Sequence, residues 1–257
     1  MKVSAGLFRL LLASQVLPWA IGPVHAQTDN SQKFEDESDG RKMQMEYGQA
    51  FRYASLKLAY SMEQVTEKNQ NLADGNQIKK RESSMRYRDQ NGRVRMSYKT
   101  LYGNERIFIA DPWAKVAYLI RPDRKDVLRI KGEPLAYRIP ADYLASPIRA
   151  PEWNKRVTTS LGLKEIAGVK AVGALTETFF PAGSRGNDKE LVETSETWAS
   201  NELPIGSIYS RNVSMRGEEL TTHIENLKFG DVQDSLFTVP SDYPVRTIVL
   251  NGAPAEQ

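Results

Sequence analysis

From about residue 60 onward, short segments with alternating apolar and polar side chains are separated by dipeptides typical of tight turns. This two-residue period is that of a β-strand with one buried face. Asp74-Gly75 and Asn91-Gly92 are the clearest hairpin turns, because both residue pairs tolerate a positive φ. The predicted strands are residues 63–72, 76–89, 93–101, 106–111, 115–121, 125–130, 161–166, 169–180, 189–200, 204–213 and 217–229.

The segment 217–229 shows what these strands have in common. Leu220 and Ile224 fall on one face of the strand, and His223 and Glu225 fall on the other. A strand with one buried and one solvent-exposed face is typical of an antiparallel sheet. A parallel sheet requires helices of about 10 residues between its strands, and the sequence shows no such helices. We predict a mostly β fold, a curved antiparallel sheet (half-barrel) with one or two short helices or a lid loop. A plain sandwich also fits the pattern.

Three further segments differ from this pattern. Residues 27–42 are polar and charged, which predicts a flexible leader. A short helix is expected over residues 43–55, where the apolar residues fit neither period well. Residues 131–156 contain four prolines and are expected to form either a linker or a lid over a cavity. Residues 43–257 then form a single antiparallel β domain.

The first 26 residues have the composition of a cleavable signal peptide. Lys2 and Arg9 precede a short apolar core, and Ala26 ends a small-residue cleavage site, so the mature chain is expected to begin at Gln27. The apolar core is shorter than the roughly 20 residues of a transmembrane helix. The chain has no cysteine, so it offers no attachment point for a lipid anchor. We therefore expect an unanchored protein in the periplasm.

The charge pattern gives little support to nucleic-acid binding. The formal net charge of +3 includes Lys2 and Arg9, so the mature chain is nearly neutral. Nucleic-acid binding usually requires a clustered excess of Lys and Arg. One basic segment, residues 79–95, contains several lysines and arginines together with Tyr87. It could contact an anionic headgroup, lipid A or nucleic acid, but we interpret it as a solvated face of the sheet.

Residues suited to catalysis are few. His223 is the only histidine after the signal peptide, and it is expected to lie on the polar face of its strand. No Gly-x-Ser-x-Gly motif is present, Cys/His zinc sites are excluded by composition, and no phosphate-binding glycine loop or calcium loop is found, so no cofactor is expected. Carboxylates on predicted strands are the remaining candidates for hydrolytic chemistry, and we expect them to pair with basic residues on neighbouring strands instead. They are Glu177, Glu193, Glu196, Glu219 and Glu225.

Aromatic residues on the strands provide the candidate ligand site. A curved sheet can enclose an apolar pocket, and a subset of its aromatic side chains would line that pocket. The candidate ligand-binding residues are Phe108, Tyr118, Phe179, Trp198 and Tyr209. No residue is assigned to catalysis or to a metal.

Several segments of the chain resemble an uncharacterised family of exported bacterial proteins. They are residues 71–78, 87–95, 109–125, 161–173, 195–200 and 234–243. The strand order and the closing motif Ser235-Leu236-Phe237-x-Val239-Pro240 are also similar to the periplasmic lipoprotein carrier (LolA-like) superfamily. The second resemblance implies a half-barrel of antiparallel strands with a helical lid over an apolar cavity that holds acyl chains.

Three functional classes follow from these observations. The first is a non-enzymatic periplasmic binding or carrier protein for a lipid, a lipoprotein acyl chain or another apolar ligand. The second is an interaction or scaffold domain of the cell envelope that docks a protein partner through its strand edges. The third is a carboxylate-based hydrolase. An open apolar concavity would favour the carrier, and a tightly filled core would favour the scaffold.

Overall fold

The computed structural model describes residues 25–72, 74–134, 155–203 and 205–250, with side chains from Asp36 onward. Residues 1–24 of the predicted signal peptide and most of the predicted linker or lid lie outside this range. The chain divides into two compact units, Met1–Ser38 and Asp39–Gln257, and the boundary falls within its long helix. The sheet and residues 39–52 of the helix belong to the second unit.

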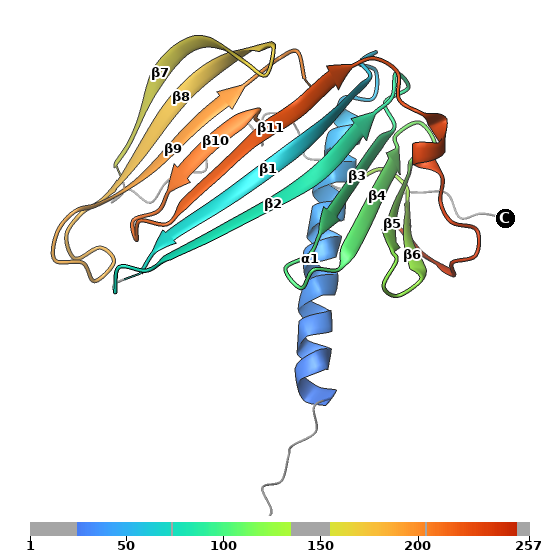
Figure 1. Cartoon of the computed structure of the whole chain (residues 1–257), viewed down its shortest axis with the longest axis horizontal. Coiled ribbons are helices and arrows are strands. Elements are labelled where there is room, and N and C mark those ends of the chain that lie inside the picture. The colour runs from blue at the N-terminus through green and yellow to red at the C-terminus, as the bar shows by residue number, and fades with distance from the viewer. Residues whose placement is uncertain (1–24, 73, 135–154, 204, 251–257) are drawn as a thin grey trace, which may run out of the picture. The chain divides into compact units, whose positions relative to one another are not determined.

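Twelve strands form one continuous sheet, which can be followed by label and colour in Figure 1. The order across the sheet is β12-β6-β5-β4-β3-β2-β1-β11-β10-β9-β8-β7. The strands are β1 (Tyr60–Asn71), β2 (Gln77–Arg88), β3 (Val94–Lys99), β4 (Glu105–Asp111), β5 (Val116–Arg121), β6 (Asp126–Lys131), β7 (Lys155–Ile166), β8 (Val169–Phe180), β9 (Leu191–Ala199), β10 (Tyr209–Val213), β11 (Glu219–Phe229) and β12 (Val245–Val249). β7 and β12 are the two edges, so the sheet does not close into a barrel.

The predicted fold class is confirmed, and most predicted strands match observed ones within a few residues. Turn chemistry explains this agreement, since Gly75 and Gly92 have φ of +87° and +84° at the predicted hairpins. Three strands differ more from the prediction. β7 begins at Lys155 instead of Leu161, and β10 begins at Tyr209 instead of residue 204. β12 was not predicted and pairs with β6 in parallel. The sheet is therefore mixed.

The helix differs most from the prediction. α1 (His25–Arg52) contains 28 residues, so it includes both the segment expected as a leader and most of the short helix expected over residues 43–55. Among the described residues, no helix combines the length and the apolar composition needed to cross a bilayer. The division of residues 1–42 into a signal peptide and a leader stays a prediction.

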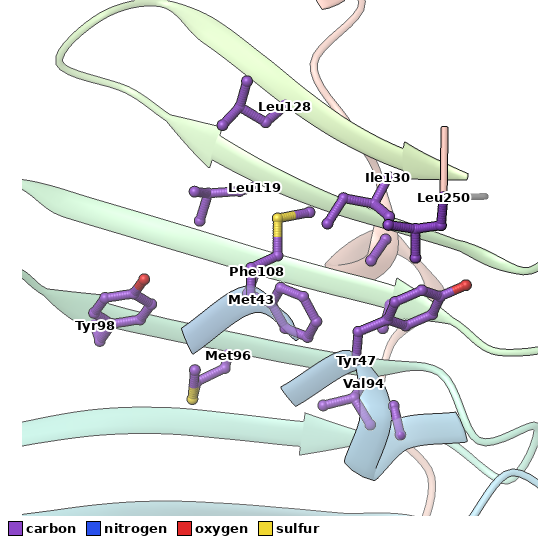
Figure 2. Close-up of a cluster of buried hydrophobic side chains, with 13 residues drawn as sticks. Met43, Tyr47, Val94, Met96, Tyr98, Phe108, Leu119, Leu128, Ile130 and Leu250 are labelled. Atoms are coloured by element: carbon purple, nitrogen blue, oxygen red, sulfur yellow. The ribbon is translucent and has the colours of Figure 1, made fainter. Parts of the chain in front are cut away.

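Residues 39–52 of α1 pack on strands β3 to β6. Met43, Tyr47 and Ala50 recur at helical spacing and are buried in one apolar cluster with strand residues such as Phe108. Figure 2 shows Met43 and Tyr47 over the strands that carry Val94, Met96 and Phe108. The Tyr47 hydroxyl donates a hydrogen bond to the backbone oxygen of Gly132 over 2.7 Å, which satisfies the polar end of a fully buried ring.

Buried arginines also hold this part of the helix to the sheet. Arg106 is fully buried; its Nε donates to Asp39 of α1 over 2.7 Å, and its Nη1 donates to Asp123 over 2.7 Å. Arg86 pairs with Glu46 of the helix and donates to Gln49 over 2.9 Å. Buried ion pairs of this kind contribute mainly to a defined geometry, because desolvation offsets much of their attraction.

These contacts correct the interpretation of the basic segment 79–95 as one solvated face. Arg86 and Arg88 are almost completely buried, and they alternate with the half-buried Met85 and Tyr87 on the other face of β2. Arg88 donates to the backbone oxygens of Tyr53 and Leu56 just beyond the helix. The sequence predicted a helix over residues 43–55, but not that residues 46–56 pack against these two side chains.

Two more apolar clusters complete the core. One lies under β4 to β6, where Ile109, Ile120 and Val127 contact Phe237 of the 3-10 turn η2 (Asp234–Phe237) and nearby residues. The other joins the starts of β1 and β8 to the segment between β9 and β10, through residues such as Met62, Trp198 and Ile208. Nothing in these three clusters comes from strand residues 155–163 of β7, so this edge is thinly packed.

Candidate functional site

One face of the sheet is covered by a helix along part of its width, and most of its side chains along the rest are half-buried or exposed. We call it the helix face, defined by Phe108, Met96 and Arg86, which lie opposite one another on β4, β3 and β2 and contact α1. Side chains alternate along a strand, so Ser84 of β2, two residues before Arg86, also lies on the helix face. Ser84 is paired with Gln64 of β1, and Gln64 with Ile224 of β11, so these two residues lie on the same face. We call the helix face of β1 and β7 to β11 the open half.

Two rows of side chains, most of which carry a hydroxyl or an amide, cross the open half. The pairing of the strands places the members of each row directly opposite one another on successive strands. Row 1 consists of Thr66, Thr222, Ser210, Thr197 and Ala174, and row 2 consists of Lys68, Leu220, Asn212, Ser195, Thr176 and Thr158. Members of a row are separated by the spacing between strands, about 4.8 Å.

The rows are held in place by hydrogen bonds between neighbouring strands. The hydroxyl oxygens of Thr66 and Thr222 are 3.3 Å apart in row 1. In row 2, the Ser195 hydroxyl donates to Oδ1 of Asn212 over 2.7 Å. The hydroxyl oxygens of Thr158 and Thr176 in row 2 are 3.2 Å apart. These bonds orient the side chains before any ligand arrives.

A hollow of about 630 Å³ lies over row 2. Its lining includes Thr176, Ser195 and Asn212 of row 2, and Arg156 and Glu193 beside them. Most of the lining side chains are polar, so the hollow is not the apolar concavity that the carrier class would show in its simplest form.

The charges of the hollow nearly balance. Lys68 and Arg156 are cationic, whereas Glu193, Glu218 and Glu219 are anionic, all five from the lining. Lys68 Nζ lies 3.6 Å from Glu218 in an exposed pair.

Glu219 is paired with a neighbouring strand. The Arg211 guanidinium donates hydrogen bonds to Glu219 over 2.7 and 2.9 Å and holds the pKa of that carboxyl below its ordinary range. This contact confirms the expectation that the carboxylate at this position pairs with a basic residue across strands.

Exposed apolar side chains lie beside the rows. Leu163 of β7 and Val172 of β8 are directly opposite each other and are 80% and 54% exposed. Val172 shares the helix face with Ala174 and Thr176, two and four residues further along β8. Leu220, within row 2, is also exposed. The open half therefore combines an apolar pair at one end with hydroxyl groups in its middle.

The five aromatic residues proposed from the sequence do not gather at one place. Phe108 lies on the helix face under α1, in the filled part of the core. The other four alternate onto the opposite face of the sheet, because Leu119, Thr178, Thr197 and Ser210 beside them in sequence take the helix face.

Only two of these aromatics are neighbours. Trp198 and Tyr209 are paired across β9 and β10, and both belong to the apolar cluster near the start of β8. Tyr118 contacts the cluster around Ile109, and Phe179 lies under the Lys155 ammonium group at 5.7 Å from the ring centre. A ligand-binding role for these residues stays a prediction.

His223 lies on the opposite face in an ionic cluster. Its Nε2 is 2.9 Å from Oε1 of Glu225, and the Arg81 guanidinium donates to both oxygens of Glu225 over 3.1 and 3.2 Å. The hydrogen bond from His223 and the charge of Arg81 lower the pKa of the Glu225 carboxyl. A carboxylate held in this way is a poor proton acceptor, so the arrangement resembles a cross-strand ion pair more than an acid/base couple.

The hydroxyl rows were not predicted from the sequence. The signal was present, since Thr176 and Thr178 on β8 and Ser195 and Thr197 on β9 alternate at the strand period. Such pairs attract little attention singly, and only the strand register shows that they meet.

Comparisons with known proteins give matches among solved structures alone. No family model and no curated protein matches the chain. It is similar to MucB (11% identity over 77% of this chain and 63% of that one, TM-score 0.39). It is also similar to the MucA/MucB complex of Pseudomonas aeruginosa (13%, 80% and 64%, TM-score 0.40), so it spans less than two thirds of these chains.

A third match is a LolA superfamily protein from Nitrosomonas europaea, with 10% identity over 75% of this chain and 96% of that one and a TM-score of 0.33. With TM-scores this low, function has to be inferred from the residues of this chain. This third structure belongs to the superfamily that the sequence also resembles.

Proposed function

We propose that this chain is a non-catalytic binding protein of the periplasm that holds an amphiphile, a lipid or lipoprotein acyl chain with its polar head, against the open half of its sheet. One observation carries the proposal. The same face of one sheet is covered by α1 over β3 to β6, whereas over most of β7 to β11 its side chains are half-buried or exposed.

The composition of the open half supports an amphiphilic ligand. Leu163 and Val172 form a contiguous apolar pair, and exposed apolar residues that adjoin one another mark binding surfaces more often than single ones do. The hydroxyl rows beside them offer hydrogen bonds to a polar head. The paired states of Glu219 and Glu225 favour a binding protein over the hydrolase alternative.

Lipid recovery from the purified protein tests this proposal. The protein would be purified from a periplasmic extract, incubated with total membrane lipid, re-isolated and extracted for mass spectrometry. We expect lipid at near-stoichiometric yield with the wild type. The double variant Leu163→Gln, Val172→Thr should lose most of it, because both changes remove apolar surface at the open half while keeping side chains of similar size.

Leu101→Gln is the matched control, since Leu101 is exposed in the turn between β3 and β4, away from the open half. It should bind as the wild type does. Recovery of no lipid above that of an unrelated periplasmic protein would rule the proposal out, and equal loss in the control would place the lipid elsewhere. The mass of the periplasmic protein also tests export, since cleavage after Ala26 leaves a chain beginning at Gln27.

A second function, docking of an envelope protein partner, is favoured by the edge strand β7. β7 pairs with β8 alone among the described strands, and nearly all of its twelve residues are exposed. An edge of this length can receive a strand from another chain. A photo-crosslinker at Thr159 of β7 should then capture one protein at high yield in cells, whereas the same group at Leu101 should not; a lipid carrier would give only scattered products.

A further inference from the structure

The hollow over row 2 has a chemistry that an acyl chain does not use. Each threonine or serine hydroxyl can donate one hydrogen bond and accept two. The contact between Ser195 and Asn212 uses the Ser195 donor and one acceptor site of the amide oxygen. In the described part of the chain, no residue accepts a hydrogen bond from the Asn212 amide nitrogen. Donors and acceptors therefore remain at short intervals along the floor of the hollow.

The spacing of these groups is regular in two directions. Neighbouring members of a row are about 4.8 Å apart, and the two rows are separated by two residues along each strand, about 6.8 Å. The resulting grid offers hydroxyl and amide groups on the scale of successive sugar rings in an oligosaccharide laid across the strands. An acyl chain would gain nothing from such a grid, because it has no group with which to hydrogen-bond.

The charges select among polar ligands. Arg156, Thr178 and Glu193 lie opposite one another across β7, β8 and β9, so a guanidinium and a carboxylate flank row 2 on the same face. Both groups can form paired hydrogen bonds to adjacent hydroxyls of a sugar. Three acidic and two basic side chains line the hollow, and this balance disfavours a phosphorylated or other strongly anionic ligand.

We infer that the hollow over row 2 binds a neutral saccharide through Thr176, Ser195 and Asn212, with Arg156 and Glu193 at its side. The inference rests on the proposed function, of which it names the polar part of the ligand. Two sources share this chemistry, the sugar head of a glycolipid and a free glycan. If the source is a glycolipid, its lipid tail would contact the apolar pair Leu163 and Val172, which lies on the same face as the hollow.

An array of immobilised neutral and acidic oligosaccharides tests the inference with the full mature protein. We expect the wild type to bind neutral members. Thr176→Val and Asn212→Leu keep the approximate shape of the side chains and remove hydrogen-bonding groups, so each should weaken binding of the best member, measured in solution by calorimetry, by about tenfold or more. Thr159→Val is the control, because Thr159 is exposed on the same edge strand and points to the opposite face.

Other outcomes contradict the inference. Binding to no oligosaccharide, binding to acidic members alone, or equal binding by Thr176→Val and the wild type would each overturn it. The two sources are separated by phosphatidylcholine vesicles with and without digalactosyl diacylglycerol. Binding to the glycolipid vesicles that far exceeds binding to the soluble sugar indicates a lipid head, and equal affinity indicates a free glycan.

The lipid-recovery experiment keeps the two proposals apart. Lipid recovered equally by the wild type and by Thr176→Val, with an empty oligosaccharide array, leaves the lipid-binding function standing and removes the saccharide. Saccharide binding without any recovered lipid would support the saccharide site and remove the lipid-binding function.

Discussion

At the scale of single residues, buried charges decide how α1 is held. Arg106 has no exposed surface, and it sits between Asp39 of the helix and Asp123 of the turn after β5. The Tyr98 hydroxyl donates to the second oxygen of Asp39 over 3.1 Å, so this carboxylate joins two strands to the helix. Removing one partner of a buried ion pair lowers the free energy of unfolding strongly, because it leaves the other charge buried without compensation.

Asp39→Asn should therefore destabilise the protein strongly. The change removes the charge that compensates Arg106, and we expect a loss of about 3 kcal/mol in the free energy of unfolding, measured from urea titrations. Glu133→Gln is the control, because Glu133 pairs with Lys115 at an exposed site over 2.8 Å and should cost under about 1 kcal/mol. Equal effects of the two variants would contradict the structural role of Asp39.

Because of Tyr47, we expect the free energy of unfolding to decrease at alkaline pH. Burial is the main cause that raises the pKa of the Tyr47 hydroxyl far above its ordinary value of 10.0. The unfolded chain then loses the proton first, so the folded state binds more protons above pH 10 and its stability falls as pH rises. Tyr47→Phe should cost about 1 kcal/mol at neutral pH for the lost hydrogen bond and should flatten this decline.

The comparison is made by measuring the difference in unfolding free energy between the wild type and Tyr47→Phe from pH 8 to pH 11. The difference should shrink above pH 10.0, the ordinary pKa of tyrosine. A difference that stays constant across this range would show that the hydroxyl titrates normally in the folded protein. Other groups that titrate in this range affect both proteins and cancel in the difference.

At the scale of elements, the strands follow local signals and the helix follows tertiary contacts. Hairpin dipeptides and prolines mark the ends of the strands, so β1 to β6 were predicted closely. α1 carries few apolar residues, and most of them lie between Met43 and Phe51, in the part that packs on the sheet. β12 was not predicted; all five of its residues are exposed, so no buried face marks it as a strand, and it pairs in parallel with β6.

Two methionines on α1 test which face of the helix is buried. Met43 is 3% exposed in the core cluster, and Met45 is 69% exposed two residues later. Met43→Ala should cost about 2 to 5 kcal/mol in unfolding free energy, because it leaves a cavity between α1 and the sheet. Met45→Ala should change stability by less than about 0.5 kcal/mol. A similar loss in both variants would mean that the helix contacts the sheet by another face.

At the scale of the whole molecule, core packing is uneven across the sheet. The middle strand β1 contributes fully buried residues such as Tyr60 and Val65, whereas the edge strand β7 contributes none. Regions of a protein that bury fewer side chains unfold locally at a lower cost in free energy. The open half, where we place the ligand, thus includes the least protected edge.

Hydrogen exchange followed by mass spectrometry should show this gradient. Backbone amides of β7 are expected to exchange faster than those of β1 by at least about tenfold, because one side of an edge strand has no pairing partner and β7 buries little surface. Added ligand should slow exchange in β8 to β11 and leave β3 to β6 unchanged. Slow exchange of β7 in the free protein would instead indicate that another chain covers this edge.

The candidate site shows the limit of sequence reasoning here. Alternation placed His223 and Glu225 together on one face of their strand, as observed. The same reasoning could not select among the aromatics, because alternation assigns side chains to two faces without saying which face α1 covers. Phe108 was therefore grouped with Tyr118, although the two lie on opposite faces.

Sequence alone determined the strand-rich fold class, the turns and the absence of the common catalytic motifs, since these depend on residues close together in the chain. Tertiary structure decided where α1 lies, which arginines are buried and which half of the sheet stays open. It also brought together row 2, whose members Thr158 and Leu220 come from distant parts of the chain. The physical reason is that a face becomes core or binding surface only when another element covers it or leaves it bare.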